Sequence, residues 1–271
     1  MKYFLYNPLA NNGIRPDFTD DMKVIEVIGL DYQKFFDELG EDDEVVMVGG
    51  DGTINYLVNA CNTDTIKQKI WYKAAGTGND FLHDIKGDPN EFVLLNDYLK
   101  DLPTVYVNGM EKKFINGIGY GIDGYCCEVA DKIKEKTPNA KIDYTGIAIK
   151  GLLFHFKPRK AKVTIDGEEF EYKHVWIGAS MKGKFYGGGM MIAPAQDRKE
   201  KGLTLVIYKT WSKIAALIVF PSIFKGEHIK HKKMIEIKKG TEIEVAFEKP
   251  CALQIDGETV LNVSSYKVKA W

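Results

Sequence analysis

One stretch decides the fold of this chain: Val45-Val46-Met47-Val48-Gly49-Gly50-Asp51-Gly52-Thr53. Its four apolar residues do not alternate with polar ones, which is typical of a strand covered on both faces in a parallel sheet. The glycines that follow let backbone approach a phosphate group without collision with a Cβ atom. The apolar spacing from Ile54 to Cys61 then predicts a helix, and amides at such a helix start point at anionic oxygens.

Asp51 lies inside this glycine turn, where a carboxylate would repel a phosphate unless a cation lay between them. Asp51 is therefore a candidate ligand of Mg²⁺, either directly or through water. The alternative is an ordinary strand-to-helix turn in which Asp51 or Thr53 caps the helix. The stretch matches neither a Walker A loop nor a GxGxxG fingerprint.

A second glycine turn, Gly76-Thr77-Gly78-Asn79-Asp80, repeats the pattern after a predicted strand at Ile70–Ala74. Gly76 and Gly78 open the backbone, Thr77 and Asn79 offer hydrogen bonds, and Asp80 offers a carboxylate. One such turn is weak evidence for a phosphate site. Two turns at neighbouring strand ends are much stronger, since ligands of α/β sheets bind beyond the carboxyl ends of the strands.

Strands and helices alternate through the first part of the chain, which predicts an α/β domain with a mainly parallel sheet. The remaining strands expected there are Lys2–Tyr6 and Val24–Ile28, and the remaining helices are Tyr32–Leu39 and Glu91–Leu99.

After Pro103 short β-like runs recur, separated by turn signals such as Asp-Gly, which predicts an antiparallel β-rich second domain. The expected strands are Phe114–Ile118, Ala161–Ile165, His174–Gly178, Leu203–Tyr208, Met234–Ile237, Glu242–Phe247, Ala252–Ile255 and Tyr266–Ala270. Two helices interrupt them, near Tyr144–Phe156 and Ser212–Phe224. The domains are placed at residues 1–107 and 108–271, with the option that the last strand returns to the first domain.

Two other motifs fall in this half. Leu253-Gln254-Ile255-Asp256-Gly257-Glu258 is locally a hairpin with Asp-Gly in its turn, and Ile165-Asp166-Gly167-Glu168 upstream shows how common that pattern is. The segment from Lys184 to Pro194 carries three consecutive glycines among aromatic residues and methionines. It indicates either a bend at a sheet corner or a close approach of backbone to a ligand.

The composition of the chain limits the classes of function that it can have. The 271 residues are 45% hydrophobic and 28% charged with a formal net charge of -1, which argues against a dedicated nucleic-acid binder. The four cysteines form no CxxC pair and are expected to be free thiols, with Cys126 and Cys127 on opposite faces of a strand. There is no signal-peptide pattern and no apolar run of ~18 residues, so a cytoplasmic location is expected.

Together these segments resemble the diacylglycerol kinase catalytic-domain family, which includes sphingosine and ceramide kinases. The resemblance runs over nearly the whole chain. The motifs occur in the same order as in the family, and this ordered combination is specific. It rests on these segments: Asn7-Pro8, Gly49–Thr53, Gly76–Asp80, Phe114-Ile115-Asn116, Tyr186–Pro194, Gly226-Glu227-His228 and Gln254–Glu258.

The resemblance implies a lipid kinase that moves the γ-phosphoryl of ATP onto a lipid hydroxyl. Its fold would be an α/β nucleotide-binding domain like that of NAD kinases and an antiparallel β-sandwich, with the active site in the cleft between them. Asp51 and Asp80 would belong to the Mg²⁺ network, Asp256 would be the general base and Glu258 its acidic partner. The nucleotide would contact Asn7, Gly49, Gly50, Asp51, Gly52, Thr53, Gly76, Thr77, Gly78 and Asn79.

Three positions depart from the family pattern. Tyr106 stands where an acidic residue often completes the metal network, and Tyr56 stands where a glutamate is frequent. Lys201 replaces an aspartate of a structural Mg²⁺ site in the second domain, where a lysine would repel a cation or substitute for it. These departures keep two alternatives open: a non-catalytic lipid- or nucleotide-binding relative, and a soluble NAD kinase-like enzyme.

Basic residues mix with apolar ones at Lys150–Lys160, and a second basic stretch follows at Lys225–Lys233. Such a rim suits reversible docking on an anionic membrane surface, whereas the alternative is solvated loops and a core-facing helix. The lipid acceptor is left open among diacylglycerol, a sphingoid base and another lipid alcohol. The oligomeric state is left open too, with a homodimer as one option.

Overall fold

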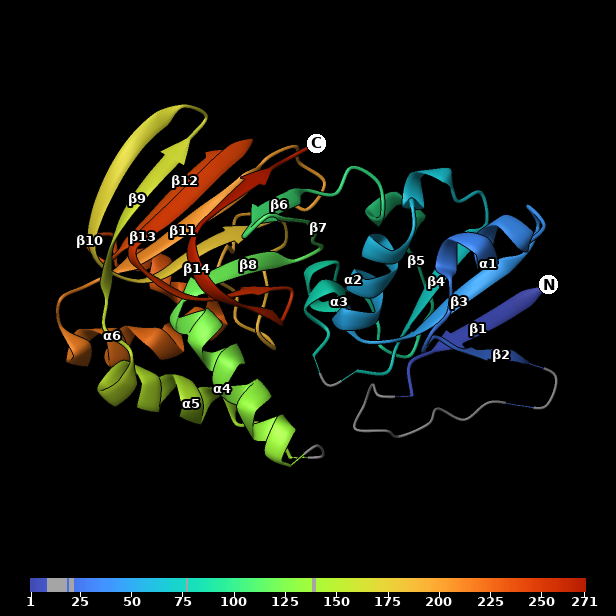
Figure 1. The fold of residues 1–271 in the computed structure, drawn as a ribbon, viewed down its shortest axis with the longest axis horizontal. Coiled ribbons are helices and arrows are strands. Elements are labelled where there is room, and N and C mark those ends of the chain that lie inside the picture. The colour runs from blue at the N-terminus through green and yellow to red at the C-terminus, as the bar shows by residue number, and fades with distance from the viewer. Residues whose placement is uncertain (9–18, 20–21, 77, 138–139) are drawn as a thin grey trace. The chain divides into compact units, whose positions relative to one another are not determined.

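The computed structural model describes residues 1–8, 19, 22–76, 78–137 and 140–271. The chain divides into two compact units, Met1–Leu102 and Pro103–Trp271, each of which is described by itself (Figure 1). The boundary lies before residue 107, where the sequence placed it, because strand β6 (Thr104–Val107) pairs with β14 (Glu258–Lys269) of the second unit. β14, the last strand, therefore does not return to the first unit.

The first unit is built on one sheet with the strand order β2-β1-β3-β4-β5. The first four strands are parallel and β5 is antiparallel, as an edge strand of a mainly parallel sheet often is. The strands are β1 (Lys2–Tyr6), β2 (Lys23–Glu26), β3 (Glu44–Gly49), β4 (Lys69–Ala74) and β5 (Val93–Leu94). Residues 45–48 of β3 are buried, which confirms the expectation of a strand covered on both faces.

The helices of this unit are α1 (Tyr32–Glu38), α2 (Asp51–Ala60) and α3 (Asp80–Asp84), with a 3₁₀ turn at Thr63–Thr65. The helix expected at Glu91–Leu99 is wrong: this segment forms β5 and a 3₁₀ turn at Asn96–Tyr98. The reason is tertiary. Asn96 accepts a hydrogen bond from the Ile70 amide at 2.9 Å and donates to the Gln68 carbonyl at 2.9 Å, which ties the segment to the edge of β4.

The second unit carries a nine-stranded sheet with the order β12-β11-β10-β8-β13-β14-β6-β7, in which β9 pairs with both β10 and β13. Its other strands are β7 (Met110–Lys113), β8 (Gly117–Gly121), β9 (Arg159–Ile165), β10 (Glu168–Met181), β11 (Leu203–Lys209), β12 (Ile235–Gly240) and β13 (Glu242–Ile255). Side chains of β8, β10 and β14 meet in one buried core, where the Tyr266 hydroxyl lies 2.9 Å from Ser180 Oγ. The sheet therefore packs on itself as an antiparallel sandwich.

Helices cover the strands of this unit along one side (Figure 1). They are α4 (Ile122–Lys136), α5 (Tyr144–Lys150), a π-helical turn η4 (Gly151–His155), α6 (Lys213–Val219) and the 3₁₀ turns Phe220–Lys225 and Glu227–Lys230. The two helices expected in this half are confirmed as α5 with η4 and α6 with the turn after it. No helix in the described part of the chain is long and apolar enough to cross a bilayer.

Two local predictions are wrong here. Cys126 and Cys127 lie in α4 rather than on a strand, since Gly121 at φ +105° ends β8 and starts the helix. The strand expected at Phe114–Ile118 begins only at Gly117, because the amides before it donate hydrogen bonds to Asp256 rather than to a neighbouring strand. The glycine-rich segment is confirmed as a bend: Tyr186 bridges to Met190 across three glycines of positive φ.

Candidate functional site

The predicted phosphate loops follow neighbouring strands and leave the sheet at the same edge. Tyr6 of β1 is in register with Val48 of β3, and Gly49 of β3 with Ala74 of β4. Parallel strands present their carboxyl ends together, so Asn7 and the two glycine turns lie side by side at this edge. The Ala75 amide also donates to the Gly49 carbonyl at 2.8 Å, which extends the ladder into the turns.

The two turns touch through their backbones. A Cβ atom built on Gly76 would lie 2.6 Å from the Cα of Gly50, and one built on Gly50 would lie 3.2 Å from the Gly78 carbonyl oxygen. A Cβ on Gly49 would lie 2.1 Å from Thr53 Oγ1, whose side chain is buried. Gly76 is therefore required by packing against backbone, Gly50 is tightly packed, and a side chain at Gly49 would displace Thr53.

Gly52 and Gly78 differ from these three glycines. A Cβ atom on either would meet nothing within 4 Å, so both lie next to open space. Gly50 is the N-cap of α2 and, as a glycine, has no side chain that could accept a hydrogen bond from the first turn of that helix. The start of α2, with its orphan amides and the positive end of the helix dipole, thus faces a region that could accept an anion.

Asp51 does not cap its own helix; it caps α3. Its Oδ2 accepts from the Asp80 amide at 2.8 Å and its Oδ1 accepts from the Phe81 amide at 3.0 Å. The carboxylate of the first turn therefore fixes the second turn in place. The alternative in which Asp51 or Thr53 caps α2 is wrong, because the N-cap of α2 is Gly50 and the Asp51 carboxylate binds the amides of the neighbouring helix.

Asn79 holds the second turn from within. Its Nδ2 donates to the Gly76 carbonyl at 3.1 Å, and its Oδ1 accepts from the Tyr72 hydroxyl at 3.2 Å. Burial and the charge of Asp51 raise the pKa of Tyr72 far above its ordinary value, so this tyrosine stays a donor. Asp80 is buried in the first turn of α3. Thr77, the remaining candidate of this turn, lies outside the described residues.

In the second unit the Asp256 carboxylate organises a stretch of backbone. It accepts hydrogen bonds from the amides of Ile115 at 2.6 Å, Asn116 at 2.9 Å and Gly117 at 2.9 Å. Asp256 itself has a φ of +45° in the turn between β13 and β14, and its amide donates to the Gly117 carbonyl at 3.0 Å. A carboxylate has roughly four acceptor positions, so three of them serve to orient this side chain.

Glu258 has a different environment. Its carboxylate forms an ion pair with Lys112 of β7, at a partly exposed position. The turn between Asp256 and Glu258 is fixed separately, since the Gly257 amide donates to Gln254 Oε1 at 2.7 Å. Within the described residues, the two acidic side chains of this hairpin are thus held by separate sets of partners.

Sequence reasoning missed the residue that supports Asp256 from behind, Arg198. This buried side chain donates through Nη2 to Asn116 Oδ1 at 2.7 Å and through Nη1 to the Ile115 carbonyl at 2.6 Å. A buried Lys182 adds a second cation nearby: its amide donates to the Asn116 carbonyl, and its ammonium lies 3.4 Å from the ring centre of Trp271. Asn116 belongs to a segment on which the family resemblance rests. Arg198 does not, and no sequence pattern marks it as buried.

A buried acid also lies on the sheet-facing side of α4. Asp123 accepts a hydrogen bond from the Tyr186 hydroxyl, and both side chains are buried. Burial raises the pKa of Asp123 to about 7, against the smaller opposite effect of the hydrogen bond from Tyr186. This pair joins the glycine-rich bend to the start of α4 and was not among the predicted site residues.

The carboxylates near the two glycine turns are the candidate ligands of Mg²⁺. Among the described residues no group of three or more His, Cys, Asp or Glu side chains could hold a metal ion. The Asp51 carboxylate is turned toward the α3 amides and Asp80 is buried. This does not fit a resident protein-bound Mg²⁺. It does fit an ion that arrives on a nucleotide, because Mg²⁺ usually takes one or two carboxylates and fills its other positions with phosphate oxygens and water.

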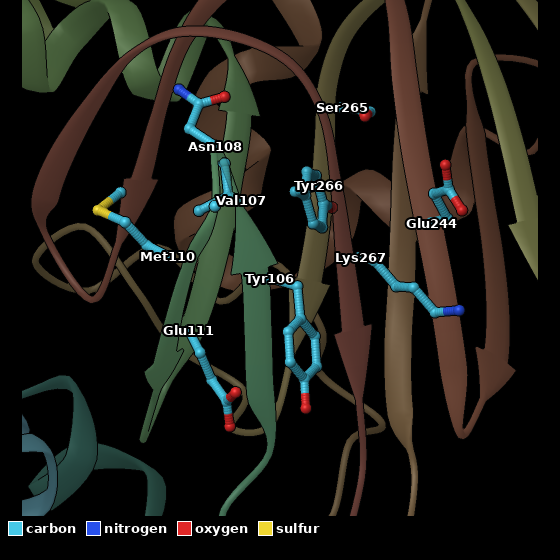
Figure 2. Close-up of a pocket in the computed structure, with 10 residues that line it drawn as sticks. Tyr106, Val107, Asn108, Met110, Glu111, Glu244, Ser265, Tyr266 and Lys267 are labelled. Carbon is cyan, nitrogen blue, oxygen red and sulfur yellow. The ribbon is translucent and has the colours of Figure 1, made fainter.

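One hollow of about 430 Å³ lies elsewhere in the second unit, between the β6–β7 hairpin and strands β13 and β14 (Figure 2). Tyr106, which replaces an expected acidic residue, lines it together with Glu244 and Lys267. The described residues that line this hollow include none of the predicted catalytic or nucleotide-binding residues. The hollow is therefore not the site that the sequence predicted.

Comparisons with known proteins agree with both units. A family model described as the diacylglycerol kinase catalytic domain matches residues 17–100, and one described as the YegS C-terminal NAD kinase beta sandwich-like domain matches residues 116–267. A diacylglycerol kinase of Mycobacterium tuberculosis is 27% identical over 197 residues, which cover 69% of this chain and 62% of the relative. A diacylglycerol kinase of Bacillus subtilis is 27% identical over 227 residues, which cover 81% of this chain and 72% of the relative.

The chain thus spans 62% of the length of the mycobacterial relative. Among solved structures, that of a diacylglycerol kinase from Bacillus anthracis has a TM-score of 0.66 at 19% identity and covers 99% of this chain and 93% of that chain. A likeness at this identity shows the fold. It confirms the expected order of an α/β unit followed by a β-sandwich unit.

Proposed function

This chain belongs to the diacylglycerol kinase family, and on that premise we propose that it transfers the γ-phosphoryl group of ATP to the hydroxyl of a lipid alcohol such as diacylglycerol. The proposal rests on one observation: two glycine turns meet at the carboxyl edge of the first sheet. There the uncapped start of α2 and two glycines beside open space offer backbone amides to phosphates.

On this proposal the first unit binds and orients the nucleotide. Phosphoryl transfer depends mainly on positioning and charge stabilisation, which a rigid cradle of amides supplies. Rigidity comes from the contact of Gly50 with Gly76 and from the Asp51 cap on α3. Bound with ATP, Mg²⁺ would neutralise charge on the phosphates, and Asp51 and Asp80 are the residues we propose to lie next to it.

The second unit supplies the acceptor side of the reaction on this proposal. Asp256 is the proposed base that takes the proton from the lipid hydroxyl, with Glu258 as an acidic neighbour in the same hairpin. Three backbone amides and, behind them, Arg198 support the position of the Asp256 carboxylate. Because a lipid acceptor is held in a bilayer, the proposal includes peripheral association of the protein with membranes.

A direct test is phosphoryl transfer from radiolabelled ATP to a panel of acceptors: diacylglycerol, a sphingoid base, ceramide and NAD. We expect a labelled lipid product with at least one lipid alcohol and none with NAD. Labelled NADP without a lipid product would instead establish the NAD kinase-like alternative. The Asp256→Asn variant is the matched control for a contaminating kinase.

A non-catalytic relative is the second candidate. Two observations favour it. Within the described residues, Asp51 belongs to no group of three or more acidic, histidine or cysteine side chains that could hold a metal ion. Tyr106, which stands where an acidic residue was expected, lines the hollow of Figure 2. ATP binding measured by calorimetry, combined with no labelled product from any acceptor, would establish this candidate over the kinase.

A further inference from the structure

One helix of the second unit is apolar on both of its faces. α6 has the sequence Lys-Ile-Ala-Ala-Leu-Ile-Val. Ala216 and Val219 are buried against the sheet and face the core. Ile214 and Ile218, four residues apart and therefore on one face, are 70% and 72% exposed. A helix that is apolar all round is normally covered on all sides, so the outer face of α6 requires an explanation.

Two aromatic residues extend this outer face. Trp211, directly before the N-cap of α6, is 81% exposed, and Phe154 of η4 is 73% exposed. The two segments are joined, because the Lys213 ammonium of α6 donates to the Leu153 carbonyl at 2.6 Å. We call the four exposed side chains Phe154, Trp211, Ile214 and Ile218 the α6–η4 face. Single exposed apolar residues are ordinary, but such a contiguous group marks an interaction surface.

The two segments that carry this face are rich in cations, although carboxylates from other segments pair with some of them, as Glu236 does with Lys209 and Glu248 with Lys160. Residues 144–160 and 209–226 contain seven lysines and arginines and no aspartate or glutamate, in a chain whose net charge is -1. Lys150, Lys157 and Lys225 are exposed and, within the described residues, form no ion pair. The apolar face is therefore bordered by cations that are available to an anionic partner.

We propose that the α6–η4 face is the surface by which the protein docks on an anionic lipid bilayer. The inference rests on the proposed lipid kinase function and adds to it the surface that reaches the substrate. Tryptophan and phenylalanine are favoured at the level of lipid headgroups, isoleucines enter the acyl boundary, and the surrounding lysines contact anionic headgroups. A protein partner would have to match both the apolar helix face and the exposed lysines of these segments, whereas an anionic bilayer offers apolar and negatively charged groups without a specific shape.

The sequence assigned a membrane rim to Lys150–Lys160 and Lys225–Lys233, with solvated loops and a core-facing helix as the alternative. The structure divides these segments differently. Phe156 and Leu152 are core residues, whereas the exposed apolar residues come mainly from α6 and from Trp211 just before its N-cap, which carried no membrane prediction. Of the segment Lys150–Lys160, only Phe154 therefore belongs to the α6–η4 face, and Lys150 and Lys157 are its proposed contacts with anionic headgroups.

The experiment measures sedimentation of the full chain with vesicles of phosphatidylcholine alone and with equal parts of phosphatidylcholine and phosphatidylglycerol. We expect binding to the anionic vesicles, weakened several-fold as NaCl rises from about 0.1 to about 1 M, because the Debye length falls from about 10 to about 3 Å. The variant Trp211→Ser/Ile218→Ser should bind at least about ten-fold more weakly, since two large apolar contacts are lost. Leu261→Ser, an exposed apolar residue on β14, is the matched control and should bind as the unchanged protein does.

The charges are tested in the same assay. Lys150→Gln/Lys157→Gln/Lys225→Gln should lose anionic selectivity, whereas the control Lys100→Gln/Lys199→Gln/Lys201→Gln, with the same change in net charge, should keep it. Unchanged thermal stability of each variant confirms that the fold is intact. Equal binding of the unchanged protein and both α6–η4 face variants would overturn the proposal. The proposal would also be overturned if the unchanged protein formed a dimer, and the Trp211→Ser/Ile218→Ser variant lost that dimer but still bound vesicles. The face would then bind a second copy of the chain.

Phosphoryl transfer to a short-chain, water-soluble diacylglycerol separates this inference from the proposed function. If both hold, the Trp211→Ser/Ile218→Ser variant keeps its rate on the soluble acceptor and loses it on vesicle-borne diacylglycerol. If only the kinase function fails, vesicle binding still depends on the α6–η4 face although neither acceptor is phosphorylated. Equal rates for variant and unchanged protein on vesicle-borne diacylglycerol would refute the docking surface and leave the kinase standing.

Discussion

Gly50 and Gly76 approach each other so closely that a single methyl group on Gly76 would lie 2.6 Å from the Cα of Gly50. Each glycine belongs to a different turn, and the two turns follow neighbouring parallel strands. Real Cβ atoms do not come this close to backbone, so the pair fixes the spacing of the two turns. The amides that we propose for phosphate binding depend on that spacing.

The first prediction concerns stability. Gly76→Ala should lower the free energy of unfolding by about 1–3 kcal/mol, because overpacking against backbone cannot be relieved by a side-chain rotation. Gly78→Ala is the matched control, since its Cβ would meet nothing within 4 Å, and it should stay within about 0.5 kcal/mol of the unchanged protein. Urea unfolding of the three proteins measures the difference. Equal midpoints would show that the turns are not in contact.

Gly52→Ala should separate binding from folding. Gly52 lies in the first turn of α2 beside open space, so alanine there keeps the helix and favours it by about 0.5–1 kcal/mol relative to glycine. The added methyl group would nevertheless stand where a phosphate has to approach. We expect calorimetry to show ATP affinity reduced by about ten-fold or more, which corresponds to ~1.4 kcal/mol. Undiminished ATP affinity would remove the start of α2 from the proposed site.

Asp256→Asn should affect both turnover and stability. Turnover should fall by about 10²–10⁴-fold if the carboxylate is the base. The carboxylate also accepts three backbone amides, and an asparagine NH₂ group would face some of these donors, at a cost of about 1–3 kcal/mol for a buried donor left unpaired. Loss of activity alone would therefore not establish the base.

Glu258→Gln is the control for this prediction. Glu258 is exposed in part and pairs with Lys112, so its replacement should leave the unfolding midpoint almost unchanged. The pH profile of kcat/KM completes the test: if Asp256 is the base, its removal abolishes the acidic limb of the profile in whatever residual activity remains. An acidic limb retained in Asp256→Asn would assign the base to another residue.

Asp123 predicts a dependence of stability on pH. Its pKa is raised by burial to about 7 in the folded chain, from an unfolded value of about 3.9. Between these values the folded state holds a proton that the unfolded state has lost, so the free energy of unfolding falls as pH rises from about 4 to about 7. A difference of about three pKa units corresponds to at most ~4 kcal/mol. The groups facing Asp123 are Tyr186, Cys126, Cys127 and the more distant Tyr266.

The measurement compares unfolding midpoints of the unchanged protein and Asp123→Asn at pH 5 and pH 8. Asparagine keeps the polar contact with Tyr186 but does not titrate. We expect the unchanged protein to gain stability relative to the variant as the pH is lowered. A difference between the two proteins that is the same at both pH values would show that Asp123 does not change its charge in this range.

Much of the first unit could be predicted because its signals are local. The run at Val45–Val48 is apolar without alternation, which is typical of a strand covered on both faces, and it is buried as expected. Glycine turns at two strand ends place a candidate site at the carboxyl edge by topology alone. Where long-range contacts decided the outcome the prediction failed, as at Asn96, whose side chain binds the edge of β4 and prevents a helix.

By itself, the sequence determined the alternation of strands and helices in most of the first unit, the β-rich character of the second, and which glycines and carboxylates are candidates for the proposed site. Only the tertiary structure decided what those groups do there: Asp51 caps α3, Asp256 holds three amides, and the α6–η4 face is exposed. The physical reason is that local patterns encode backbone conformation and burial, whereas hydrogen-bond partners and exposed faces depend on residues far apart in the chain.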